Sequence, residues 1–226
     1  MLARRALLVG VDAITFFMVV IAGRVVPMFT RNATRVESIR SVPKLDAASA
    51  LSIAVVILLD ASGTTSAVAR VAVYAIAAAL VAARTVHWGM RASFRDPLLW
   101  ILHLGHAFIP LGLVLRAASA ASPTIPASAG LHAITAGAVG ALTLGMMARV
   151  SLGHTGRLIV APRSATIAFV LVLSAAVVRV GAPLLFPSAY LQALALTAAL
   201  WGLAFAIYAV AYAPILFAPR IDGKPG

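Results

Sequence analysis

The stretch LHAITAGAVGALTLGMMARVSLGHTGR, residues 131–157, decides the fold class of this chain. It holds about twenty apolar or small residues in succession, which is the length that an α-helix needs to cross a bilayer. Its glycines, Gly137, Gly140 and Gly145, allow a second helix to approach closely. The stretch therefore predicts a transmembrane helix inside a bundle, followed by a polar and basic loop.

The rest of the chain has the same character. Its 226 residues are 62% hydrophobic and 11% charged, a composition typical of a membrane protein. Prolines and polar loops separate seven predicted spans, at about residues 5–29, 45–62, 67–90, 97–116, 128–152, 164–186 and 190–217. We therefore expect an all-α fold, a polytopic transmembrane helical bundle of about seven helices, forming a single domain over residues 1–226.

Composition also excludes several classes of function. The chain has no cysteine, so it offers no thiolate ligand and no cysteine nucleophile. A net charge of +12 would suggest nucleic-acid binding in a soluble protein, but here the basic residues lie mostly between apolar runs. The expected partner is the lipid bilayer, with no nucleic acid. No Ser/His/Asp arrangement, carboxylate pair or phosphate-cradling loop supports hydrolytic or phosphoryl-transfer chemistry.

The loop charges predict the orientation in the membrane. Ten basic residues fall on one side: Arg31, Arg35, Arg40, Lys44, Arg91, Arg95, Arg157, Arg163, Arg220 and Lys224. The other side shows Arg4, Arg5, Arg70 and Arg116, the last two at span edges. Because cytoplasmic loops carry the excess of Lys and Arg, we expect a cytoplasmic C-terminus and an N-terminus outside.

Depth along each span separates the histidines into two levels. His103 and His106 lie ~9 and ~14 Å from the cytoplasmic end of their span and share a helical face. Met146 and Met147 are predicted at a similar height, whereas His132 lies near the outer end. A separation of roughly 15–20 Å means that His103 and His132 cannot ligate one metal. Each could be a metal ligand, since imidazole commonly binds haem and copper, or a hydrogen-bonded packing residue.

Two further intramembrane charges need partners, because an isolated charge in hydrocarbon is costly. Asp12 and Arg179 lie at similar depths near the outer ends of their spans, and we expect them to form an ion pair. The alternative is that Arg179 holds an acidic group of a cofactor near His132. Asp60, closer to the end of its span, is expected to reach water.

Three segments together resemble a known family. They are IAGRVVPMFT at residues 21–30, LHLG at residues 102–105 and the opening stretch. They are similar to the NnrS family, haem- and copper-containing bacterial membrane proteins associated with nitric oxide stress. The resemblance covers most of the chain but only the C-terminal part of a typical member. It implies haem b and copper as cofactors, a place in the bacterial inner membrane and a role in the nitrosative stress response.

The resemblance also selects candidate site residues. The metal ligands that it favours are His103, His132 and His154, with His106 and Met147 as second choices. Arg24, Arg149 and Arg157 become candidates to hold haem propionates through charge-assisted hydrogen bonds. From the residues alone, the segment from Gly153 to Arg157 is equally well explained as an interfacial turn.

Typical members of that family have additional helices upstream. We therefore expect a truncated or split chain, completed by a separate N-terminal helical partner. Two other functions remain open from the sequence. The chain could be half of a transporter or channel, whose intramembrane His and Arg residues line a polar path, or a structural subunit that needs an upstream helical partner.

Overall fold

The computed structural model describes residues 2–63 and 66–223, and within these ranges the chain is helical with no strand. The elements in order are α1 (Leu2–Thr34), α2 (Pro43–Ser62), α3 (Ala67–Ala83), η1 (Arg84–His87), α4 (Met90–Ser93), α5 (Pro97–Ala121), α6 (Ala127–His132), η2 (Ala133–Val139), α7 (Gly140–His154), α8 (Arg163–Leu185), η3 (Pro187–Ala189) and α9 (Tyr190–Phe217). Seven helical runs in the described residues are long and apolar enough to cross a membrane. This confirms the predicted all-α bundle with seven spans.

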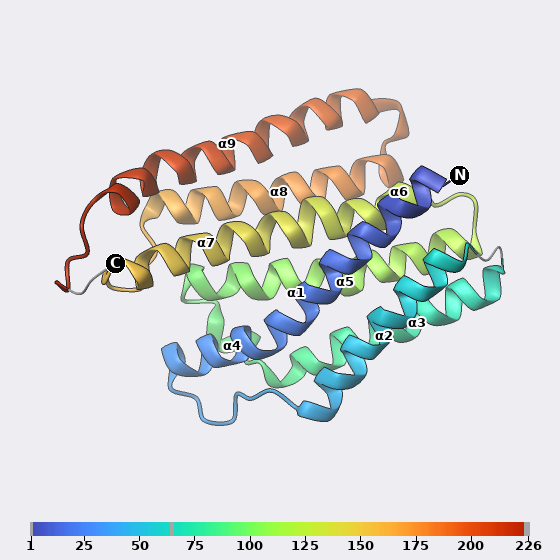
Figure 1. The fold of residues 1–226 in the computed structure, drawn as a ribbon. Coiled ribbons are helices and arrows are strands. Elements are labelled where there is room, and N and C mark those ends of the chain that lie inside the picture. Colours follow the sequence, from blue (N-terminus) through green and yellow to red (C-terminus); the bar gives the residue numbers. More distant parts are fainter. Residues whose placement is uncertain (1, 64–65, 224–226) are drawn as a thin grey trace.

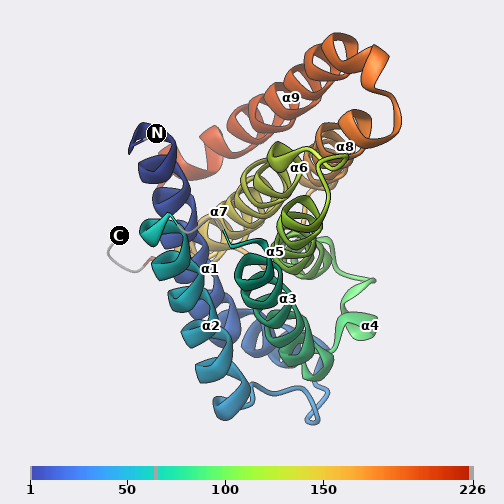
Figure 2. The same ribbon diagram turned by 90° about the vertical axis from the view of Figure 1, so that its right-hand side faces the viewer.

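The spans run alternately in opposite directions (Figure 1). We call the end where α5 begins the Pro97 end; α1, α3, α7 and α9 also end there. The opposite end, which holds the start of α1, is the Leu2 end. Helix α1 packs on α2, α2 on α3, α3 on α5, α5 on α7, and α8 on α9. Helix α5 therefore joins an α1–α3 half to a half made of α6 to α9 (Figure 2).

Small residues set the closest helix contacts. A Cβ placed on Gly145 of α7 would lie 2.8 Å from Ile101 Cγ2 of α5, and one on Gly137 would lie 2.5 Å from Phe108 Cδ1. Both distances are too short for carbon atoms, so a larger residue would force α5 and α7 apart. The prediction that these glycines permit close helix approach is confirmed.

Helix α5 begins where its sequence predicts. The Asp96 carboxylate accepts a hydrogen bond from the Leu98 amide at 2.9 Å, and Pro97 occupies the first helical position. A capping carboxylate and a proline at this position both favour a helix start, because neither leaves an amide unsatisfied. This fixed start sets the height of His103 and His106 above the Pro97 end.

Two spans differ in length from the prediction. Helix α1 extends over Leu2–Thr34, and α5 continues beyond Arg116 to Ala121. Arg116 is therefore not a basic residue at a span edge but a buried one inside the bundle. The outward faces of the spans carry large exposed apolar side chains such as Leu51, Leu58 and Val177, which would contact lipid in a multi-pass membrane protein.

Candidate functional site

His103 and His106 lie together against one aromatic side chain. Their rings contact the indole of Trp88 edge to face, with centroids 6.4 and 4.7 Å away. Trp88 follows η1, so the segment after α3 provides the surface on which this face of α5 packs. The prediction that the two histidines share a helical face is confirmed.

Hydrogen-bond partners assign the tautomer of His103. The Thr30 hydroxyl donates its proton to the Val26 carbonyl at 2.8 Å, so its oxygen can only accept from His103 Nε2, 2.9 Å away. This is the only hydrogen bond of the ring within the described residues. In the neutral tautomer that donates from Nε2, Nδ1 keeps its lone pair. His103 is therefore a buried imidazole with a nitrogen free to bind a metal.

His106 has the opposite arrangement. Arg84 Nη2, which can only donate, lies 3.3 Å from His106 Nε2. The proton of the neutral ring must then be on Nδ1, a buried atom without a partner in the described residues. Neither nitrogen of His106 offers a lone pair to a metal in this arrangement. The i and i+3 histidines thus differ in the chemistry that they can perform.

Arg84 also belongs to this cluster, and sequence reasoning missed it. It is 1% exposed, donates to the Val19 carbonyl at 2.5 Å and lies 4.9 Å from the centre of the Trp88 ring. Three N–H groups of the cluster have no acceptor in the described residues: Arg84 Nε, Trp88 Nε1 and His106 Nδ1. Arg84 lies inside the predicted span 67–90, and no sequence motif singled it out; only the structure shows that it turns inward.

Arg149 of α7 is a further buried cation, and it packs against α1. Arg149 of α7 is buried above the Phe29 ring, 4.2 Å from its centre, and two of its guanidinium nitrogens lack partners in the described residues. Phe29 precedes Thr30, the residue that accepts from His103. Arg149 and His103 therefore contact consecutive residues of α1.

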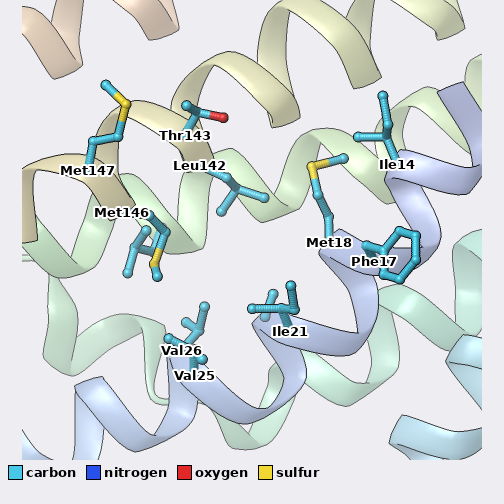
Figure 3. A pocket seen from close by; sticks show the side chains of 12 residues that line it. Ile14, Phe17, Met18, Ile21, Val25, Val26, Leu142, Thr143, Met146 and Met147 are labelled. Atoms are coloured by element: carbon cyan, nitrogen blue, oxygen red, sulfur yellow. The ribbon is translucent and has the colours of Figure 1, made fainter. Parts of the chain in front are cut away.

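A cavity of about 450 Å³ opens between α1 and α7 in the same region. Side chains of the two helices line it from opposite sides, and its sulfur-bearing members are Met18, Met146 and Met147 (Figure 3). Leu102, which precedes His103, also lines it. The predicted common height of the methionine pair and His103 is confirmed, although His103 itself turns toward Thr30 and Trp88.

His132 is the last residue of α6, near the Leu2 end, whereas His103 lies toward the Pro97 end of α5. Its Nε2 atom lies 2.6 Å from Arg179 Nη2, and the same Arg179 nitrogen is 3.5 Å from the Tyr190 hydroxyl. The arginine must donate, so this imidazole nitrogen accepts. The two histidines are in separate places, as the height argument predicted, and His132 Nε2 is already occupied by a hydrogen bond.

The predicted ion pair between Asp12 and Arg179 is wrong. Asp12 instead binds Arg116, whose two terminal nitrogens lie 2.5 and 3.4 Å from its carboxylate oxygens. Asp60 is also different from the expectation, because it is 6% exposed and binds Arg116 rather than water. The Tyr74 hydroxyl donates to Asp60 at 2.5 Å and completes a buried network contributed by four helices.

The remaining candidates are more exposed and lie apart from His103. His154 is exposed and lines a surface pocket with Arg220 near the end of α9. Arg157 donates to the Ile215 carbonyl at 3.4 Å, which joins the loop after α7 to α9. Arg24 lines a different cavity, between α1 and α2. The structure thus places Arg149 and His103 against consecutive residues of α1, and the methionine pair lines the cavity that Leu102 also reaches. Arg24, Arg157 and His154 have other neighbours.

The donor set fits a haem or copper ion in part. His103 offers a lone pair, Arg149 offers unpaired donors for an acidic group, and methionine sulfur suits Cu(I) and haem iron. Among the described residues, however, no three His, Cys, Asp or Glu side chains are grouped closely enough to hold a metal ion. Any metal held here would rest on His103 and on ligands other than those residue types.

Comparison with known proteins agrees with this arrangement at the level of the family. No curated protein and no solved structure matches the chain. The family model described as NnrS protein matches residues 1–220, nearly the entire length. A seven-span helical bundle with this sequence match therefore belongs to the NnrS family.

Proposed function

We propose that this NnrS-family chain is a haem-binding membrane protein of the nitric oxide response, with copper as a second metal. Family membership supports the link to nitric oxide. The observation that carries the haem assignment is His103, a buried imidazole with no hydrogen-bond partner for Nδ1 in the described residues. A bound haem would supply an iron that can coordinate nitric oxide.

The surrounding residues of this chain have separate roles in the proposal. His103 provides the ligand nitrogen, and the hydrogen bond from Nε2 to Thr30 orients the ring, as ligand histidines generally require. Arg149 provides donors for a carboxylate of the cofactor, because two of its buried nitrogens lack partners in the described part of the chain. The apolar wall between α1 and α7 keeps water away, and Met146 and Met147 place thioether sulfur there.

The decisive experiment is an optical spectrum of the purified protein with a metal assay. His103→Ala should remove the Soret band, because it deletes the free imidazole nitrogen. His106→Leu and His87→Ala should keep it, since His106 Nε2 is bound by Arg84 and His87 lies at the edge of η1. A protein that binds haem equally well with and without His103 would contradict the assignment.

His132 provides a second test of the same proposal. Because it lies at the opposite end of the bundle, bonded to Arg179, His132→Ala should leave the signal that depends on His103 unchanged. The double variant should show additive losses if His132 supports a second metal, as expected of distant sites. Loss of one common signal in both single variants would mean that the two imidazoles share an iron.

The orientation belongs to the same proposal. The Pro97 end and the C-terminus face the cytoplasm, and the protein lies in a bacterial inner membrane. The reason is that most loop arginines and lysines lie at the Pro97 end. A fluorescent protein fused to the C-terminus should be bright, and a phosphatase that works only in the periplasm should be inactive there. The reverse result would invert the bundle.

A further inference from the structure

A polar cavity lies between α1 and α2 at the Pro97 end, separate from the methionine-lined cavity. Its volume is about 400 Å³, and its polar lining residues are Arg24, Ser41, Asp46 and Arg84. This size is within the range of small-molecule sites. Arg84 also contacts Trp88 and His106, whereas His103, Arg149 and the methionine pair do not line this cavity.

The cavity presents hydrogen-bond donors that have no acceptor. Arg84 is buried, and its Nε has no partner in the described residues. Arg24 and the Ser41 hydroxyl likewise make no hydrogen bond to the described part of the chain. A buried donor left unpaired costs about 1–3 kcal/mol, so the Arg84 Nε group indicates a bound acceptor. Arg24 is exposed and Ser41 half-buried, and both line the same cavity.

The N-terminus of α2 adds to the same preference. Helix α2 has twenty residues, starts at Pro43, and its N-cap Val42 provides no side-chain hydrogen bond. The first amides of an uncapped helix point outward and favour a negative group. Pro43, the first residue of the helix, is part of the cavity lining, so the N-terminus of α2 lies at the same cavity as Arg24 and Arg84.

The charge balance of the cavity is positive. Asp46 lies 3.4 Å from Arg84 and neutralises one of the two guanidinium groups, which leaves one positive charge. Gly23 makes this approach possible, because a Cβ there would lie 2.9 Å from Arg84 Nη1 and 3.0 Å from the Asp46 carboxylate. An anion with several acceptor oxygens would pair the remaining donors.

We propose that this cavity binds a phosphate group, and its position at the end of two membrane spans favours the headgroup of an anionic phospholipid. Basic pockets between transmembrane helices bind such headgroups. The neighbouring loop adds attraction at longer range through Arg31, Arg35, Arg40 and Lys44. The site is independent of haem, because neither His103 nor Arg149 lines it.

The test is lipid retention by the full-length protein in neutral detergent, measured by native mass spectrometry with phosphatidylglycerol or phosphatidylcholine added. The wild type should retain phosphatidylglycerol preferentially. Arg24→Gln should weaken that retention about fivefold, as expected for one basic residue near a membrane surface. Arg31→Gln, the matched control outside the cavity, should change it less than about twofold.

Asp46→Asn makes the experiment robust against misfolding, because it should increase retention. The substitution removes the carboxylate that competes for Arg84 while keeping an oxygen that can accept its hydrogen bond. Excess inorganic phosphate distinguishes the source of the ligand: displacement of the lipid shows that free phosphate also enters, and no displacement shows a site for lipid alone. Equal retention of both lipids, unchanged in Arg24→Gln and Asp46→Asn, would overturn the proposal.

Discussion

The bundle contains two buried polar regions that share helix α5, and they differ in how their hydrogen bonds are satisfied. In the network of Asp12, Asp60, Tyr74 and Arg116, each terminal nitrogen of the arginine has a partner. In the cluster of Arg84, Trp88 and His106, each side chain has one buried N–H without an acceptor in the described residues. The first arrangement holds helices together. The second leaves donors available.

This difference indicates separate roles for the two ends of the bundle. Fully paired buried charges fix which helices pack together, and removing one partner is costly because the other charge remains buried. Unpaired buried donors are rare in folded proteins, and they commonly mark a place for water, an ion or a ligand. The Arg116 network near the Leu2 end is therefore structural, whereas the Pro97 end holds both proposed binding sites.

The largest effect is expected for Arg116→Ala. It leaves two carboxylates buried without a counter-charge, so we expect a loss of about 3–5 kcal/mol in the free energy of unfolding. Thermal unfolding of the detergent-solubilised protein measures this loss. Arg4→Ala, an exposed arginine near the same end, is the control and should unfold like the wild type. A stable Arg116→Ala protein would show that the network does not hold the helices.

The two carboxylates provide the next test. Asp12→Asn or Asp60→Asn leaves one carboxylate to balance Arg116, so each single change should destabilise the protein by about 1–3 kcal/mol. The double change leaves a buried guanidinium unpaired, and its effect should exceed the sum of the two single effects because the groups share one partner. Strict additivity in unfolding measurements would argue against a shared network.

The smallest effects come from removing single hydroxyl groups, and two tyrosines form a matched pair. Tyr74 and Tyr212 are both fully buried, but the Tyr74 hydroxyl donates to Asp60 whereas the Tyr212 hydroxyl has no partner in the described residues. Tyr74→Phe should cost about 0.5–1.5 kcal/mol because Asp60 keeps its bond to Arg116, and Tyr212→Phe should be neutral or slightly stabilising. Unfolding midpoints of the two variants compare them directly, and equal losses would mean that Tyr212 has a ligand or water partner.

The failed ion pair shows where sequence reasoning stops. Counting residues placed Asp12 and Arg179 at similar depths, and an α-helix makes such heights reliable because its rise per residue is constant. Arg116 lies near the same end of the bundle, but the predicted span ended at this residue, so it was counted with the loop charges and not as a partner. Helix α1 packs on α2 and α5, whereas Arg179 lies on α8, and this choice of neighbours decided the partner.

Four features could be predicted from the amino-acid sequence alone. They are the seven spans, the start of α5, the close helix approach at Gly137 and Gly145, and the height of His103 and His132 in the membrane. These features depend on hydrophobic length, caps and side-chain size, which act locally along the chain. Which side chains contact each other across helices could be seen only in the folded structure. In the folded chain, Arg84 contacts His106 and Arg149 contacts Phe29. Arg116 binds both Asp12 and Asp60. The height of a side chain in a span follows from its residue number. Which residue it contacts depends on which neighbouring helix packs against that face of the span.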